Sequence, residues 1–389
     1  MDLELSDDQR ELKDSVRAVL ERECPPSLVR RVIEEGKGTE ELWARMVELD
    51  WPALTVPEEN GGIGLGFVEL AVVAEELGRV LAPAPFLATA AQFVPAIRAA
   101  GSAEQCRRFL GAVAGDGIVG SLAMAEPSGS WDVADVATTA VRDGDGWVLS
   151  GEKRFVFDGA RADELVVVAR VGDTTGDDGI GLFVVPQAAV RSEPLDDIDA
   201  SRQYAAVVLD AVRVDADRVL GDPGTAGATV RRVVDEATAA LAAEMVGTCQ
   251  AIFDIVHTYV GEREQFGVKI GSFQAVKHKL SNMFVALESA RATTYFAALT
   301  VAEDDERRPL AIATAKASVA DCQRLIAQEG IQCLGGIGYT WEHDMHMYVK
   351  RVKATAAMFG SGATHRARVA QLIGLGGVAA GARAASTAS

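Results

Sequence analysis

The chain has 389 residues, of which 49% are hydrophobic and 24% charged, and its 38 basic and 56 acidic residues give a net charge of −18. This length allows two or three domains with a large hydrophobic core. The strong negative charge argues against electrostatic binding of nucleic acid or of an anionic membrane surface, so neither is expected as a partner.

Cysteine usage and the N-terminal residues bear on location. The five cysteines are scattered without a CxxC pair, which is typical of a reducing compartment rather than of a disulfide framework. The N-terminal stretch is charged and helical in pattern, with Ser6 as the expected N-cap. The sequence contains no run of about 18 apolar residues of the kind that would predict a membrane span. We therefore expect a soluble, cytoplasmic protein.

Three regimes follow one another along the chain. Residues 1–118 predict an N-terminal helical domain. Residues 119–224 change to short β-branched runs separated by Asp and Gly, which predicts a β domain built as an antiparallel sandwich or barrel. Residues 225–389 return to long helices, expected at 225–262, 272–301, 307–334 and near 342–375. The sequence thus predicts an α+β multidomain protein with a C-terminal four-helix bundle, and the lack of βαβ alternation argues against a Rossmann domain.

Within the bundle, the stretch REQFGVKIGSFQAVKHK at 263–279 interrupts two helical segments. Gly267 and Gly271 would each weaken a helix by about 1 kcal/mol relative to alanine. The side chains around them do not follow a core pattern, and they include Arg263, Phe266, Phe273 and Gln274. A break that presents an arginine, aromatic rings and an amide suggests a binding role.

Two glycine-rich segments, NGGIGLG at 60–66 and LGGIGYT at 334–340, are similar to phosphate-binding loops. Neither follows a predicted strand, and neither continues as a complete nucleotide-binding fingerprint. A loop that ends a helix explains the first segment. The second follows Gln332 and stays a candidate for a binding role.

Residues 341–351, WEHDMHMYVKR, place two histidines and two carboxylates close together. His343 and His346 would share one helix face, but a structural metal site needs three or four organised ligands. The remaining histidines occur singly in helical stretches. We therefore expect capping and polar contacts at a helix start, and no metal.

Three groups of segments, taken together, resemble the acyl-CoA dehydrogenase family of flavoproteins. They are AEPSGSWD with GEKRFVFDG in the β domain, REQFGVKIGSFQAVKHKL in the bundle, and IQCLGGIGYT in its third helix. PEENGGIGLG and the α–β–α order also match, so the resemblance covers nearly the whole chain. It implies FAD, bound non-covalently between the β domain and the bundle, with the adenine dinucleotide part reaching a neighbouring subunit.

The resemblance also implies a set of FAD contacts. Those made across the subunit interface correspond to Arg263, Phe266, Gln274, Gln332 and Gly336. An arginine suits a pyrophosphate, a phenylalanine packs on a ring system, and glycine allows close approach of the backbone.

The β-domain segment that lines the flavin and the thioester contains Ala125, Ser130 and Trp131. Phe155 and Phe157 stand where the family places an aromatic and a hydroxyl residue against the isoalloxazine. Phe157 therefore departs from the family and loses a possible hydrogen bond to the flavin. The alternative for both phenylalanines is a place in the β-domain core.

The family removes a proton from the thioester α-carbon while a hydride leaves the β-carbon for flavin N5. This chemistry needs a carboxylate close to the α-carbon, whereas the flavin carries the redox step. The two positions at which the family places this base correspond to Gly360 and Ala237. The position at which the family often has an arginine that contacts the CoA corresponds to Thr238. All three expected side chains are thus replaced.

Three carboxylates on the first bundle helix remain candidates for the base. Glu244 lies two helical turns beyond Ala237 on the same face, in an apolar setting that would raise its pKa toward that of a working base. We predict Glu244 as the base; the alternative is a buried glutamate paired with a neighbouring helix. Asp235 and Glu236 are the other candidates, unless they are solvated first-turn carboxylates favoured by the helix dipole.

The leading hypothesis is an FAD-dependent acyl-CoA dehydrogenase of lipid metabolism that forms a 2-enoyl-CoA. The resemblance implies a tetramer and an electron-transferring flavoprotein or similar acceptor. Residues 341–351 and FGSGATHRARVA resemble an actinobacterial-type subset, in which some members are α2β2 heterotetramers with only one chain supplying the base. The alternative is therefore a non-catalytic partner subunit that completes the FAD site of a paralogue.

Overall fold

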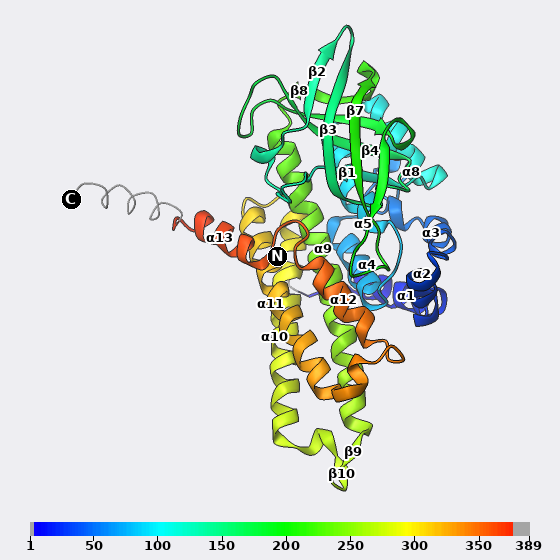
Figure 1. The fold of residues 1–389 in the computed structure, drawn as a ribbon, viewed down its shortest axis with the longest axis vertical. Helices are drawn as coiled ribbons and strands as arrows, with labels where there is room; N and C mark the ends of the chain where they lie inside the picture. Colours follow the sequence, from blue (N-terminus) through cyan, green and yellow to red (C-terminus); the bar gives the residue numbers. More distant parts are fainter. Residues whose placement is uncertain (1–3, 376–389) are drawn as a thin grey trace, which may run out of the picture.

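The computed structural model describes residues 4–375, and they form N-terminal helices, a central β-sheet and a C-terminal helical bundle (Figure 1). The sheet lies at one end of the long bundle helices. A small hairpin lies at the other end, and the N-terminal helices pack beside the bundle. This α–β–α plan confirms the fold class predicted from the sequence.

The N-terminal helices are mostly short. They are α1 (Asp7–Glu23), α2 (Pro26–Glu35), α3 (Thr39–Glu48), α4 (Phe67–Arg79), α5 (Phe86–Ala88), α6 (Val94–Ala100), α7 (Ala103–Gln105) and α8 (Gly111–Asp116). Ser6 caps α1 as predicted, because its hydroxyl accepts a hydrogen bond from the backbone N–H of Gln9 at 3.2 Å. Two π-helical segments, Thr89–Phe93 and Cys106–Leu110, join α5 to α6 and α7 to α8.

The central strands form one eight-stranded sheet in the order β6-β7-β3-β2-β4-β5-β8, with β1 beside β4. They are β1 (Gly120–Ala123), β2 (Thr139–Asp143), β3 (Gly146–Phe157), β4 (Glu164–Val171), β5 (Ile180–Pro186), β6 (Arg191–Leu195), β7 (Tyr204–Val214) and β8 (Val219–Gly224). Most pairings are antiparallel, as predicted, but β4 pairs in parallel with β1 and with the start of β2.

Both faces of β4 are buried. Leu165 and Val167 face the core of the β domain itself, whereas Val166 and Val168 face the main core shared with the helices. This alternation follows from the two-residue period of a strand. The sheet is therefore held between two apolar layers, and its ends meet the bundle.

The bundle consists of α9 (Gly227–Glu262), α10 (Gln274–Ala302), α11 (Arg308–Leu334), α12 (Met345–Thr355) and α13 (Gly362–Leu372). The helix predicted near 342–375 is thus divided by a break at 356–361. Phe359 and Gly360 adopt positive φ angles of 53° and 98°, which ends the helical path. The hydroxyl of Ser361 then caps α13 by accepting from the Thr364 N–H at 3.2 Å.

Helix α9 is the central helix of the molecule. Among the described helices it alone is long and apolar enough to cross a membrane by length and composition, but 78% of its apolar window is buried inside the fold. Its apolar character is therefore that of a core helix.

Helices α4 and α9 cross with their backbones in contact. A Cβ added to Gly78 would lie 2.0 Å from the carbonyl oxygen of Glu244, and one added to Gly247 would lie 1.8 Å from that of Glu75. Because Cβ atoms do not approach other atoms this closely, the crossing requires glycine at both positions. It fixes the N-terminal helices against the bundle.

Candidate active site

A cavity of about 400 Å³ lies where the β domain meets α9 and the break between α12 and α13. Residues from three separate parts of the chain line it. They are Gly129, Ser130, Trp131, Asp132, Val133 and Asp135 after β1, Arg231, Val234, Asp235 and Thr238 on α9, and Phe359, Gly360, Thr364, His365 and Arg368 around the break. The fold thus brings together five positions singled out from the sequence: Ser130, Trp131, Asp235, Thr238 and Gly360.

Aromatic rings close one side of this cavity. Phe157, at the end of β3, stacks face to face on Phe359, with ring centroids 5.3 Å apart and planes within 6°. Trp131 also packs on Phe359, with the ring centroids 4.6 Å apart and the ring planes tilted by 59°. Phe157 is 1% exposed and Phe359 is 3% exposed, so the stack is buried. Phe155 lies two residues before Phe157 with a positive φ of 56° and packs against the main core.

The loop after β1 is held by its own polar contacts. The Ser130 hydroxyl donates to Asp135 at 2.6 Å, and the carbonyl of the buried Ala125 accepts from the Arg154 N–H at 2.8 Å. The next residue, Glu126, accepts from the buried Lys153 ammonium at 2.8 Å. These contacts anchor the loop that carries Trp131 to β3, the strand that ends in Phe157.

Two of the carboxylates considered from the sequence are buried and paired. Asp235 is 4% exposed and accepts two hydrogen bonds from Arg368, at 2.6 and 3.0 Å. Glu236 is 2% exposed and pairs with Arg98 at 2.9 Å and Arg232 at 3.1 Å. Their interpretation as solvated first-turn carboxylates is therefore wrong, because both side chains are buried and α9 begins at Gly227, about two turns before Asp235. Of the two, Asp235 lines the cavity.

Glu244 lies outside the cavity lining, in a buried ionic network. Its carboxylate accepts from Arg202 at 2.6 and 2.5 Å and from Arg351 at 2.6 Å. Burial acts to raise the pKa of Glu244, but the two arginines outweigh it and hold the pKa below its ordinary value. The expectation of a raised pKa is therefore wrong, and the alternative of a buried glutamate paired with a neighbouring helix is confirmed by Arg351 on α12.

The network extends from Glu244 into the β domain. Arg351 also pairs with Asp199 and donates to the Ser201 hydroxyl at 2.8 Å, and both residues lie in the loop between β6 and β7. Asp199, Arg202, Glu244 and Arg351 together carry no net charge. Such a balanced cluster holds its geometry. To accept a proton, Glu244 would have to break its ion pairs with Arg202 and Arg351. We infer that Glu244 joins the domains rather than accepting a substrate proton.

The residues matched to the dinucleotide part of FAD lie at the far end of the bundle. α9 ends before Arg263, and β9 (Glu264–Gln265) and β10 (Val268–Lys269) form a hairpin with Phe266 at its tip (Figure 1). Phe266 is 93% exposed. Gln274 begins α10, and the Lys279–Glu329 ion pair holds this end of α10 beside the end of α11. There, Gln332 and Gly336 are exposed.

The hairpin and the cavity are too far apart to serve one cofactor molecule within one chain. Along a helix that rises about 1.5 Å per residue, the path from Thr238 to Arg263 spans roughly 38 Å. An exposed arginine, amide and aromatic ring suit a dinucleotide reached from another subunit. The hairpin therefore fits the dinucleotide limb of FAD, whereas the Phe157–Phe359 stack offers no hydrogen-bonding group to the flavin ring.

The histidines of 341–351 serve packing and capping. The Nδ1 atom of His343 accepts from the backbone N–H of Met345 at 3.0 Å, at the start of α12. His346 stacks on Trp341 with ring centroids 4.4 Å apart. Across residues 4–375, no group of three or more His, Cys, Asp or Glu side chains has the arrangement of a metal site. The capping prediction for this segment is confirmed by the His343 contact.

Sequence reasoning missed the residues that hold the break between α12 and α13. His365 bonds the Phe359 carbonyl at 2.8 Å, and the buried Lys316 on α11 donates to the Thr355 carbonyl at 3.0 Å. Gln323, about two turns further along α11, donates to the Thr355 hydroxyl at 3.3 Å. The sequence signal that could have revealed these contacts is a lysine and a glutamine, Lys316 and Gln323, among the apolar residues on the core-facing side of α11.

Comparison with known proteins places these features in a family. Models of the N-terminal, middle and C-terminal domains of acyl-CoA dehydrogenases match residues 6–116, 121–211 and 228–374. The chain is 29% identical to the mitochondrial short-chain specific acyl-CoA dehydrogenase of Bos taurus, over 95% of this chain and 90% of that protein.

Two mycobacterial proteins are also similar. "Probable acyl-CoA dehydrogenase FadE25" of Mycobacterium tuberculosis is 27% identical, over 93% of this chain and 94% of that protein. A chain of the ChsE4–ChsE5 complex from the same organism shares the fold, with a TM-score of 0.87 and 24% identity over 96% of this chain and 99% of that one. The chain described here belongs to the acyl-CoA dehydrogenase family of oxidoreductases.

Proposed function

We propose that this chain takes part in the FAD-dependent dehydrogenation of an acyl-CoA thioester to the 2-enoyl-CoA. The observation that carries the proposal is the separation of the exposed Arg263–Gln274 hairpin region from the cavity beside Trp131. Since one chain cannot bring both to a single cofactor, we infer a FAD site shared between subunits. The assembly is then a homotetramer or an α2β2 heterotetramer with a paralogue.

The residues of this chain have distinct roles in such an assembly. Arg263 pairs with the pyrophosphate, Phe266 packs on a ring, and the amides of Gln274 and Gln332 bond the dinucleotide of the neighbouring subunit's site. When bound, FAD supplies the hydride acceptor and passes electrons to an electron-transferring flavoprotein or a similar carrier. Trp131 and Thr238 line the space for the thioester.

If this chain also removes the α-proton, Asp235 is the residue we assign to that step. It lies on α9 with its side chain buried, and it lines the cavity, whereas Glu244 does not. Arg368 would have to release the carboxylate, since it now holds both oxygens. Once Arg368 moves away, the carboxylate oxygens of Asp235 can accept a proton from a substrate bound in the cavity.

The flavin spectrum of the lone chain tests this proposal. The purified protein is titrated without oxygen with short, branched, long and steroid-like acyl-CoAs. Bleaching by one of them, lost in Asp235→Asn but kept in Asp132→Asn, supports catalysis by Asp235. Asp132 is a matched control because it also lines the cavity but is exposed. Bound FAD that no acyl-CoA reduces would contradict catalysis by this chain.

A second candidate function is favoured by the closed aromatic stack. Phe157 and Phe359 bury each other where the family would place the flavin ring, and Gly360 stands in place of a base. This arrangement supports a non-catalytic partner subunit that completes a paralogue's FAD site through its hairpin. Under this alternative the chain is colourless alone and gains flavin on co-expression with a paralogue. A stable, flavin-replete homotetramer would exclude it.

A further inference from the structure

We propose that a second cavity, between the N-terminal helices and the bundle, binds an uncharged aliphatic molecule with one polar end. The cavity has a volume of about 510 Å³ and shares no lining residue with the candidate active site. This volume falls within the roughly 300–1,000 Å³ typical of small-molecule sites. The proposal does not depend on the function proposed above.

The floor of this cavity is aliphatic. Helix α4 contributes Val68, Ala71 and Val72, and helix α9 contributes Ala243 and Val246. All five side chains are at most 8% exposed, although they border open space. Two of the five are alanines, which leave the volume that larger side chains would fill. A surface of this kind gains free energy when an apolar chain displaces water from it.

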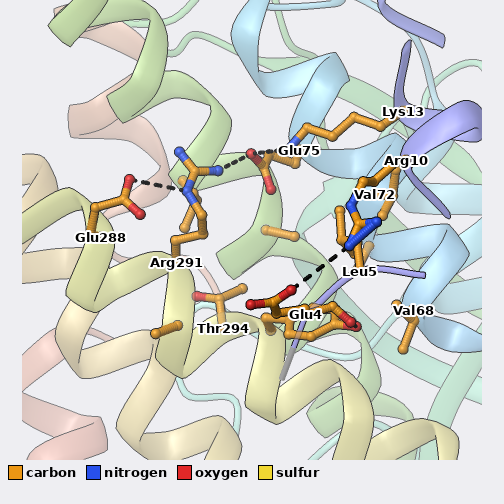
Figure 2. A pocket seen from close by; sticks show the side chains of 15 residues that line it. Glu4, Leu5, Arg10, Lys13, Val68, Val72, Glu75, Glu288, Arg291 and Thr294 are labelled. Atoms are coloured by element: carbon orange, nitrogen blue, oxygen red, sulfur yellow. Dashed lines mark hydrogen bonds and ion pairs between the residues drawn. The ribbon is translucent and has the colours of Figure 1, made fainter. Parts of the chain in front are cut away.

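The rim is charged but balanced, as Figure 2 shows. Lys13 contacts Glu75 at 3.0 Å, and Arg291 pairs with the same carboxylate. Arg291 also lies 3.4 Å from Glu288, and Arg10 lies 3.8 Å from Glu4. Three cations thus face three carboxylates.

An ionised ligand would have to displace one member of these pairs. Glu75 is the most sheltered of the carboxylates: burial raises its pKa, but Arg291 and Lys13 outweigh burial and keep the pKa below its usual value. Leaving such a carboxylate without its cation is costly. The rim therefore selects against fatty acids and against acyl-CoA, whose phosphates need spare cations, and favours an uncharged molecule.

The mouth of the cavity provides the polar environment for one end of the ligand. Tyr295 on α10 lines the cavity, and its hydroxyl donates to the backbone carbonyl of Glu4 at 3.0 Å. Glu4 and Arg10 are exposed, so this edge faces water. An aliphatic alcohol fits both features, because its chain covers the floor while its hydroxyl stays among the polar groups of the mouth.

The test compares octan-1-ol with octanoate, which has the same chain length but a negative charge. Isothermal titration of the full chain should show saturable binding of octan-1-ol to one site, at least tenfold tighter than octanoate. Ala292→Trp, at an exposed lining position on α10, should weaken octan-1-ol binding at least tenfold. Ala18→Trp is the matched control, because Ala18 is exposed on α1 but does not line the cavity.

A second variant guards against an indirect effect of the rim substitution. Val72→Phe fills the cavity from its floor and should also abolish binding of octan-1-ol, with folding checked by circular dichroism. The proposal is overturned if octan-1-ol does not bind saturably, or if octanoate binds as tightly. It is also overturned if Ala292→Trp and Val72→Phe both bind octan-1-ol like the unmodified chain.

Discussion

The imidazole of His365 lies against the backbone of Gly360, so that a Cβ added to Gly360 would be 3.1 Å from Nε2 of His365. Burial, with the nearby charges of Lys316 and Arg368, lowers the pKa of His365 to about 4. The ring is thus neutral near pH 7, and Nε2 donates to the Phe359 carbonyl, which can only accept. The backbone around His365 therefore favours glycine at position 360, which is one of the two positions where the family places its base.

Gly360→Glu is expected to destabilise the chain rather than to restore a catalytic base. The new side chain would combine a left-handed backbone at φ 98° with a contact against His365. We expect a loss of about 1–3 kcal/mol in the free energy of unfolding, measured by urea denaturation. Gly172→Glu is the control, because Gly172 has φ 69° with nothing within 4 Å of an added Cβ. Equal losses at both positions would show that the His365 contact is unimportant.

Glu244→Ala is expected to lower the free energy of unfolding by about 3–5 kcal/mol, because it leaves Arg202 and Arg351 buried without their shared carboxylate. Chemical denaturation of the two proteins measures the loss. Glu262→Ala, at an exposed position on the same helix, should change stability by less than about 0.5 kcal/mol. A small loss at Glu244 would mean that water replaces the carboxylate.

The same glutamate predicts a specific acid sensitivity. Because the folded state lowers the pKa of Glu244 below its ordinary 4.5, the stabilisation is complete above that pH and is lost as the pH falls through the folded pKa. Glu244→Gln removes this titrating group. The stability advantage of the unmodified chain over the variant should therefore shrink below pH 4.5, and an advantage independent of pH would refute the ionised state.

Lys316→Met should change the response to alkaline pH. Burial lowers the pKa of Lys316 to about 7 from 10.5, so between these values the unfolded chain binds more protons than the folded one. The free energy of unfolding of the unmodified chain should then rise between pH 7 and 10 relative to the variant. Lys277→Met, at an exposed position, should show no such difference. Parallel pH curves for Lys316→Met would contradict a deprotonated Lys316.

Phe266→Ala should affect the assembly without affecting the subunit. The ring is 93% exposed and contacts Phe273 edge to face at 6.3 Å, so its removal should change the free energy of unfolding of the monomer by less than about 0.5 kcal/mol. Flavin content and the fraction of tetramer, measured by absorbance and sedimentation, should both fall. Val141→Ala, which also removes an exposed apolar side chain, should leave both unchanged.

The features that the sequence could predict depend on local patterns. Ser6 as a helix cap and the break between two bundle helices around Gly267 follow from residue preferences within a few positions, whereas the hairpin that forms this break was not predicted. The helices α9, α10 and α11 begin and end within two residues of their predicted limits, because apolar periodicity over more than 25 residues is a strong signal. The motifs that resemble the family are likewise short segments, so they too could be found from local sequence.

The features that the sequence could not predict depend on contacts between residues that are far apart in the chain. Glu244 looked like a candidate base because its helix is apolar, but its partners Arg202 and Arg351 are 42 and 107 residues away. Phe157 meets Phe359 only because β3 and the break before α13 converge. The parallel pairing of β4 with β1 depends likewise on the order of strands in the sheet, which local periodicity does not contain.

The glycine crossing of α4 and α9 has a consequence for how this chain can vary. At the crossing, Glu75 and Glu244 each present a backbone carbonyl to a glycine of the other helix, while their side chains point to the charged rim and to the interdomain network. A methyl group at either glycine would push the helices apart and pull both ionic systems out of register at once. The tolerance of Gly78 to substitution is therefore tied to that of Gly247, and we expect relatives to keep or lose the two glycines together.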